Sequence, residues 1–257
     1  MTTRRLDYLE LTLLTTAATL WAFYYYVVGH LAQRSGIDFG ESLMTPLDAA
    51  IPHTDLFLPF YLLWYLMHFI TAGMVVRFYG RDLPMLRRFF GGTILLWGLA
   101  YGAFLLFPNS IEHLLHTGFE EGLRVWSGAE TAFSQLVPFW NAAPSLHVAA
   151  GWFYYRAIWQ HTKPEWRRWY LFWVLLMSLA TVTLKYHYLV DVLVGVLCAE
   201  LAFSLSIGKR DILRTEHWDR LPRRQLLTLQ GGAVLVLGGG LGLSMEAGFW
   251  QFFRESP

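Results

Sequence analysis

The chain has 257 residues, of which 55% are hydrophobic, 17% are aromatic and only 15% are charged. This composition excludes an ordinary water-soluble domain and is typical of a polytopic membrane protein. The formal net charge of +1 gives no basis for a nucleic-acid partner, and the single cysteine, Cys198, excludes an intrachain disulfide.

Seven apolar stretches are long enough to span a bilayer, which takes about 20 residues for a helix. They cover residues 11–29, 55–76, 89–107, 144–160, 168–186, 188–207 and 227–248. The sequence therefore predicts an all-α integral membrane protein with seven helices, or with six helices and a tail. No Ala-x-Ala-like site follows the first stretch, so we expect an uncleaved membrane helix there. We assign residues 1–210 to a membrane core and residues 211–257 to a basic cytoplasmic loop and a glycine-rich C-terminal helix.

Basic residues predict the orientation of these helices. Sixteen of the 20 Lys and Arg residues fall on one side under the seven-helix assignment, and four fall on the other: Arg34, Arg124, Lys185 and Arg254. Because Lys and Arg are enriched in cytoplasmic loops, we expect a cytoplasmic N-terminus and a C-terminus outside. The localisation we expect is the cell (inner) membrane.

Two loops on the outer side are too polar to span the membrane. For residues 30–54 we expect a short interfacial helix around 41–50. For residues 108–143 the apolar pattern over 111–119 predicts an amphipathic helix that lies over the outer side.

Three side chains of the second outer loop are candidates for metal binding. Glu112, His113 and His116 place two histidines three residues apart beside a carboxylate. No cysteine or third close ligand completes a site there, so we expect an interfacial helix and no metal. His68 is the only histidine deep within an apolar stretch, and we expect it to make an interhelical hydrogen bond.

The last apolar stretch is unusually rich in glycine between Gly231 and Gly242. Small residues let membrane helices approach one another closely. We expect this helix to pack tightly against the core, or against a second copy of the chain in a homodimer.

The strongest chemical signal is the stretch from Lys185 to Asp191, Lys-Tyr-His-Tyr-Leu-Val-Asp. On a helix, His187 and Asp191 would share one face because they are four residues apart. A carboxylate beside an imidazole fixes its tautomer and aims the far nitrogen away as a nucleophile or base. The alternative is a buried polar pair that locks two helices, but ionisable residues in membrane segments tend to be functional.

A second stretch, from Asn141 to His147, opens another apolar helix. Pro144 suits the first turn of a helix, and Ser145 and His147 follow directly behind it. A helix N-terminus with free N–H groups and a hydroxyl favours an anion, and the usual anion is phosphate.

Together these stretches resemble the type 2 phosphatidic acid phosphatase superfamily, whose second motif runs Pro-Ser-Gly-His and whose third ends His-x-x-x-Asp. The matching residues are Pro144, Ser145, His147, His187 and Asp191. Leu146 replaces the family glycine. The run from His187 to Val192 is more similar to the inositol phosphorylceramide synthase branch, which carries Ser-x-His and His-Tyr-x-x-Asp-Val.

The resemblance implies a six-helix phosphatase-type core, to which the seventh helix is an addition. It implies that His187 attacks phosphorus to form a phosphohistidine, that Asp191 orients it, and that His147 is the general acid and base. Ser145 and the adjoining helix N-terminus would hold the phosphate. The resemblance implies neither a metal nor another cofactor.

Three cations of the family pattern are missing. The first motif, Lys-x6-Arg-Pro, aligns with Ala100, Phe107 and Pro108, so only its proline is kept. In the third motif, Ala180 and Thr181 stand where a Ser-Arg pair is expected.

Phosphoryl transfer needs positive charge to neutralise the phosphate oxygens. We expect Lys185, two residues before His187, to supply it, followed by Arg124 in the second outer loop. The alternative for Lys185 is a cation that snorkels to the membrane interface.

These features predict a membrane enzyme that acts on a lipid phosphate or phospholipid at the periplasmic, extracytoplasmic or lumenal face. Water as acceptor would make it a phosphatase, and an alcohol such as inositol would make it a transferase. One alternative is a catalytically inactive, lipid-binding family member, because the first motif is missing. Another is a haem or quinone protein, but such sites place paired histidines well within the bilayer.

Overall fold

The computed structural model describes residues 8–79, 82–115, 117, 125–126, 128, 140–208 and 221–244. The long helices are α1 (Tyr8–Arg34), α4 (Leu58–Tyr79), α5 (Leu83–Leu106), α8 (Leu146–Ile158), α9 (Pro164–Thr183), α10 (Leu189–Ser206) and α12 (Arg223–Ser244). The short ones are α2 (Gly40–Leu43), α3 (Pro46–Ala50), α6 (Glu112–Leu115) and the 3₁₀ turn η1 (Trp159–His161). Each of the seven predicted membrane segments overlaps one of the long helices.

Within the described part of the chain, five helices are long and apolar enough to cross a membrane: α1, α4, α5, α10 and α12. The prediction of an all-α integral membrane protein is therefore confirmed. α8 is shorter than predicted, with 13 residues, and η1 continues it by one turn. It is nevertheless the central helix, because only Trp152 and Arg156 among its residues escape full burial.

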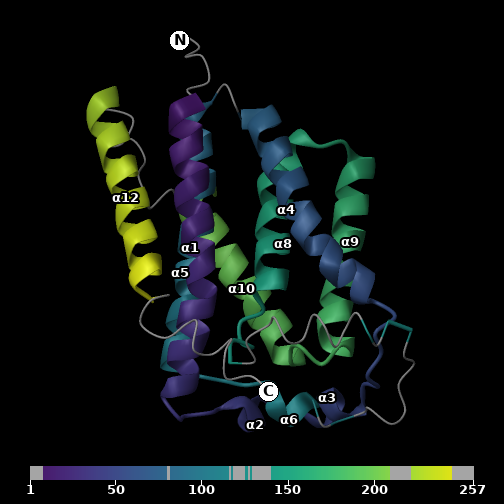
Figure 1. Ribbon diagram of the computed structural model, residues 1–257. Coiled ribbons are helices and arrows are strands. Elements are labelled where there is room, and N and C mark those ends of the chain that lie inside the picture. The colour runs from purple at the N-terminus through teal and green to yellow at the C-terminus, as the bar shows by residue number, and fades with distance from the viewer. Residues whose placement is uncertain are drawn as a thin grey trace.

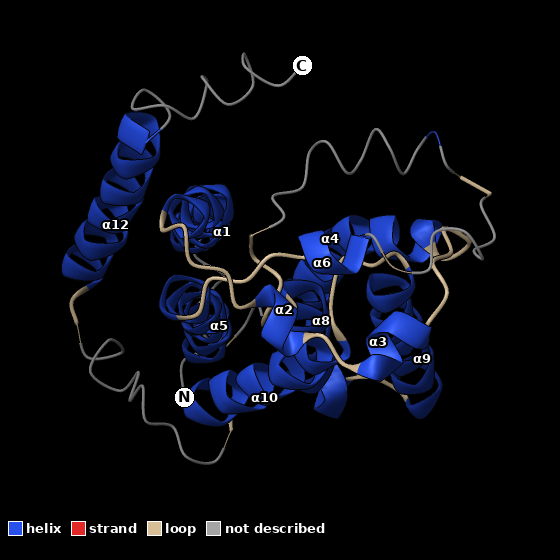
Figure 2. Ribbon diagram, turned by 90° about the horizontal axis from the view of Figure 1, so that it is seen from below, coloured by secondary structure: helices blue, strands red, loops and turns tan. Residues whose placement is uncertain are grey.

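The long helices form a bundle with α8 in the middle, in contact with α4, α5, α9 and α10 (Figures 1 and 2). α2, α3 and α6 lie together at one end of the bundle, where α8 and α10 begin (Figure 1). The outer loops thus contain short helices, as expected, but they differ in extent. Residues 40–50 form two helices, and the second loop forms only α6 among its described residues.

Local sequence explains where several helices start. Asp82 caps α5 by accepting the N–H of Met85 at 3.1 Å. Thr45 and Asp48 form a reciprocal capping box at α3, which has proline at its first position. Proline also occupies the first position of α9, at Pro164.

The glycine-rich helix α12 packs against α1 at the edge of the bundle (Figure 2). The Tyr24 hydroxyl donates to the carbonyl oxygen of Leu237 at 3.1 Å, and a Cβ at Gly240 would collide with that hydroxyl. Near the start of α12, the Gln230 amide donates to Oε1 of Glu10 on α1 at 3.2 Å. α12 thus contacts α1, with a close approach at Gly240, whereas a Cβ at Gly231, Gly232, Gly239 or Gly242 would meet nothing within 4 Å. The homodimer stays a prediction.

Candidate active site

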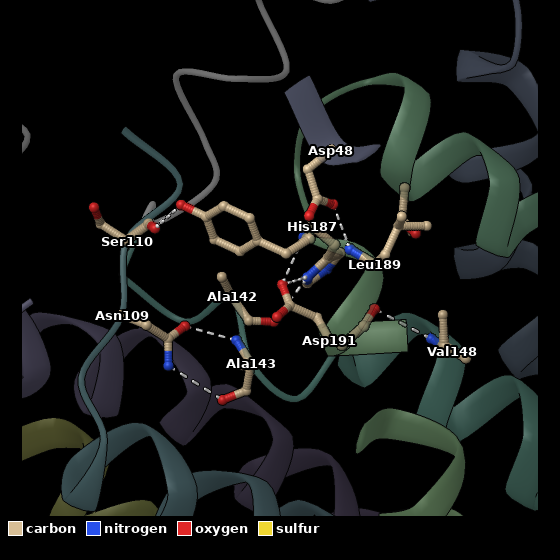
Figure 3. A network of polar contacts seen from close by, with 12 residues as sticks. Asp48, Asn109, Ser110, Ala142, Ala143, Val148, His187, Leu189 and Asp191 are labelled. Carbon is tan, nitrogen blue, oxygen red and sulfur yellow. Dashed lines mark hydrogen bonds and ion pairs between the residues drawn. The ribbon is translucent and has the colours of Figure 1, made fainter. Parts of the chain in front are cut away.

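The two motif stretches meet where α8 and α10 begin (Figure 3). The backbone N–H of Ser145 donates to the carbonyl oxygen of Asp191 at 3.1 Å. A Cβ at Gly195 would lie 2.7 Å from the carbonyl oxygen of Ser145, so the two backbones touch. This contact brings the ring centroids of His147 and His187 to 5.9 Å. The structure therefore brings the two motifs together.

His187 lies two residues before α10 and not within it. The helix-face argument for its contact with Asp191 was therefore wrong, although the contact itself exists. Asp191 is in the first turn of α10, and its Oδ2 accepts the backbone N–H of Tyr188 at 2.8 Å. This capping bond turns the carboxylate back toward His187, whose Nδ1 lies 3.4 Å from the same oxygen.

A second and shorter bond to His187 was not visible in the sequence. Nδ1 lies 2.8 Å from the carbonyl oxygen of Ala142 (Figure 3). A carbonyl oxygen has no proton to donate, so Nδ1 must carry one. In the neutral ring, Nε2 then keeps its lone pair, which is the tautomer that a nucleophile or base requires. Asp191 is fully buried, and its Oδ1 has no hydrogen-bond partner among the described residues.

His147 sits in the first turn of α8 against two aromatic side chains of α4. Its ring centroid lies 4.3 Å from that of Tyr61 and 4.5 Å from that of Trp64. The Trp64 indole donates to the carbonyl oxygen of His147 at 3.1 Å. The Nε2 atom of His147 is buried and has no hydrogen-bond partner within the described part of the chain. This nitrogen is therefore available for proton transfer to a bound group.

Ser145 is the N-cap of α8, and its hydroxyl oxygen accepts the N–H of Val148 at 3.5 Å. Pro144 precedes this cap, so it lies two residues before the first turn, in which the sequence had placed it. The Ser145 hydroxyl is fully buried and still has its own proton to donate. Its place at the start of α8 suits an anion.

Lys185 adopts a positive φ of 60° and is almost fully buried. Its ammonium donates to the carbonyl oxygens of Asp48 at 2.6 Å and Ile51 at 2.5 Å. Burial lowers the pKa of Lys185, and the nearby Asp48 carboxylate works against that shift. The structure thus attaches Lys185 to α3, whereas His147, His187, Asp191 and Ser145 come together. Arg124 lies outside the described residues.

Further polar contacts hold the outer loops to the site (Figure 3). The Asp48 carboxylate accepts the N–H of Leu189 at 2.7 Å. Asn109 accepts the N–H of Ala143 at 2.7 Å. The Tyr188 hydroxyl donates to the carbonyl oxygen of Ser110 at 2.8 Å. Of these residues, only Asp48 could have been found from the sequence, through the Thr45-x-x-Asp48 capping pattern.

The candidate metal-binding region in the second outer loop contacts Asp38 of the first outer loop. Nε2 of His113 lies 3.6 Å from Oδ2 of Asp38. His116 lies outside the described residues. Among the residues that the structure describes, no group of three or more His, Cys, Asp or Glu could hold a metal ion. His68 lies 3.4 Å from the carbonyl oxygen of Trp64 in its own helix, so this contact is not the interhelical one expected.

Comparison with known proteins gives one match. The family model of the PAP2 superfamily matches residues 27–205. This range includes both motifs and ends in the last turn of α10, so that α12 lies beyond it. No curated protein and no solved structure matches the chain.

Proposed function

The chain belongs to the PAP2 superfamily, and from this premise we propose that it is a membrane-embedded lipid phosphatase or phosphotransferase that works through a phosphohistidine. Membership supports a phosphatase-type enzyme in general. The chemistry proposed for each residue rests on the geometry of the site and on the motif resemblance.

The single observation that carries the proposal is the environment of His187. Its Nδ1 proton is directed to the carbonyl of Ala142 and to Asp191, which leaves Nε2 as the reacting atom. Nε2 forms a bond to phosphorus while the bond from phosphorus to the leaving oxygen breaks. The ring becomes positively charged in this step, and the buried Asp191 carboxylate stabilises that charge.

His147 supplies and removes the second proton. It protonates the leaving oxygen during the first step and takes a proton from the acceptor hydroxyl during the second. Its unpartnered Nε2 and its position beside His187 support both roles.

The phosphate oxygens would be bound by the Ser145 hydroxyl and the first N–H groups of α8. Arg124 is the proposed source of positive charge. A site with so few cations also favours a second candidate function, a catalytically inactive lipid-binding member of the superfamily.

The proposed substrate is a lipid phosphate or phospholipid, because the site lies at one end of the bundle, where lipid head groups would be. Most of the described basic residues belong to the opposite end, and those around the turns from α4 to α5 and from η1 to α9 are Arg77, Arg87, Arg88, Lys163, Arg167 and Arg168, whereas Arg34 and Lys185 lie at the same end as the site. This separation supports an outward-facing site. The acceptor would be water or an alcohol such as inositol, the latter favoured by the His-Tyr-x-x-Asp-Val run.

Radiolabel retained on the protein from an activated aryl phosphate tests the proposal. An aryl oxide leaves without a proton, so His147→Ala should still load phosphate onto His187 and should accumulate acid-labile, base-stable label. His187→Ala should show neither label nor turnover. Phosphate release from a panel of lipid phosphates separates an enzyme from an inactive lipid-binding protein. Label on His187→Ala, or none on His147→Ala while the parent turns over, would mean that the two roles are assigned incorrectly.

A further inference from the structure

A short helix outside the bundle contacts the chain on both sides of His187. Lys185, two residues before His187, donates its ammonium to the Asp48 and Ile51 carbonyl oxygens at one end of α3. Leu189, two residues after His187, donates its N–H to Oδ1 of Asp48 at 2.7 Å. Both ends of the turn that carries His187 are therefore bonded to residues at α3. Figure 3 shows the bond at the Leu189 end.

Asp48 is held rigidly enough to serve as an anchor. Its Oδ2 accepts both the N–H and the hydroxyl of Thr45, at 2.8 and 2.5 Å, while Oδ1 is left for Leu189. A further bond joins the same outer segment to the end of α9, from the N–H of Thr54 to the carbonyl oxygen of Thr183 at 2.9 Å. Asp48 is 1% exposed, so water does not compete for these bonds.

Lys185 has an unusual backbone conformation. A φ of 60° is uncommon for any residue other than glycine, and Asn and Asp are the usual exceptions. Lysine offers no such local advantage, but its ammonium satisfies two carbonyl oxygens at the end of α3. The side-chain contact thus offsets an unfavourable backbone conformation.

Resting on the function proposed above, we propose that Asp48 and Lys185 form a clamp that positions His187 for attack on phosphorus, with Lys185 acting through α3 and not as a phosphate ligand. His187 acts only while Nδ1 faces the carbonyl of Ala142 and the Asp191 carboxylate. Release of either end of the turn lets the ring leave that position. Asp48 and Lys185 are positioning residues in this scheme, because neither touches the reacting atoms.

Leu189 offers a substitution that removes one bond of the clamp and little else. It is the first residue of α10, and Tyr188 before it has an extended backbone with φ −74° and ψ 158°. Proline is favoured at the first helical position and requires an extended residue before it. Leu189→Pro should therefore fold while lacking the N–H that Asp48 accepts. Leu189→Ala loses most of the same side chain but keeps that N–H.

The clamp predicts a selective loss in the first chemical step. Phosphoenzyme formation should be roughly 10- to 100-fold slower in Leu189→Pro than in Leu189→Ala, because small misplacement of a reacting group costs rate. Asp48→Asn and Lys185→Met should slow the same step, while KM and the inhibition constant of inorganic phosphate stay within about twofold of the parent values. Asp82→Asn alters the same kind of capping carboxylate at the opposite end of the bundle, and it should load phosphate at the parent rate.

Two results would overturn the clamp. One is equal loading by Leu189→Pro and Leu189→Ala. The other is a rise in the inhibition constant of phosphate in Lys185→Met that matches its fall in kcat/KM, which would make Lys185 a phosphate ligand.

A measurement without turnover separates the clamp from the proposed function. In ¹⁵N-histidine spectra, His187 of the parent should show a single tautomer protonated at Nδ1, and Leu189→Pro should show a mixture of tautomers. If the parent forms no phosphoenzyme, the phosphohistidine proposal fails. The positional role of the clamp is then decided by these spectra, and an unchanged His187 signal in Leu189→Pro overturns it.

Discussion

His187 makes its shortest hydrogen bond to a backbone carbonyl, that of Ala142, at 2.8 Å. The Asp191 carboxylate lies 0.6 Å farther from the same nitrogen, at 3.4 Å. A peptide carbonyl cannot change protonation state, so the tautomer of His187 does not depend on Asp191 alone. The carboxylate contributes mainly negative charge and the cap on α10.

Asp191→Asn should therefore be milder than the same change in a catalytic triad. A triad whose histidine depends on its carboxylate for the correct tautomer loses about 10⁴-fold in kcat when that carboxylate becomes an amide. Here the carbonyl of Ala142 keeps the tautomer, so we expect a loss of roughly 10- to 100-fold from the missing charge. Single-turnover loading of Asp191→Asn checks this, and a loss near 10⁴-fold would mean that the carboxylate alone sets the tautomer.

Gly195→Ala should destabilise the protein and lower its activity. The added Cβ would lie 2.7 Å from the carbonyl oxygen of Ser145, and backbone cannot move aside cheaply. We expect a loss of about 1–3 kcal/mol in the free energy of unfolding, as for other overpacked sites. Unfolding in SDS and phosphate release from the same preparations measure both effects.

Gly232→Ala is the matched control for that experiment. A Cβ at Gly232 meets nothing within 4 Å, and alanine is favoured over glycine in a helix by up to about 1 kcal/mol. Its stability should be unchanged or slightly raised. If both variants behave alike, the close approach of α8 and α10 is not what requires glycine at position 195.

Activity should be insensitive to metal chelators. The proposed nucleophile is an imidazole, and the described part of the chain contains no cluster of three metal-ligating side chains. Phosphate release in excess EDTA should match that in untreated enzyme. Loss of activity with rescue by a divalent ion would direct attention back to Glu112, His113 and His116.

The membrane orientation is testable by reporter fusions. Fusions after Arg81, Lys163 and Arg220 should report the cytoplasm, and a fusion after Arg124 should report the outside, because Lys and Arg are enriched in cytoplasmic loops. An outside signal at Arg81 or Arg220 would contradict both the orientation and the outward-facing site.

The sequence predicted the long helices well because a bilayer requires continuous apolar runs, and such runs are visible without knowledge of tertiary contacts. It also predicted that His147 and His187 lie at the same end of the molecule, since each opens a helix on the predicted outer side. The stretch predicted over 188–207 begins one residue before α10, but the helix-face argument treated His187 as part of that helix. Tyr188 takes the capping position there, and this moved His187 out of the helix.

The contacts that hold the site in place could not be predicted from local sequence patterns. The carbonyl of Ala142 has no residue-specific signature, because every residue has such a group. The bond from Leu189 to Asp48 joins positions 141 residues apart. Lys185 was predicted to bind phosphate because it is close in sequence to His187, but its side chain is directed to α3.

Tyr61 and Trp64 of α4 pack against His147 but belong to a different segment of the chain from the two proposed catalytic histidines. α8 and the turn before α10 carry the proposed reacting groups and are joined backbone to backbone, whereas Tyr61 on α4 lays its ring against that of His147. Exchange of that ring would reshape the space beside His147 and leave the spacing of the two imidazoles unchanged. Substitution of Tyr61 should therefore alter which substrates fit beside His147 more than it alters the proposed reaction.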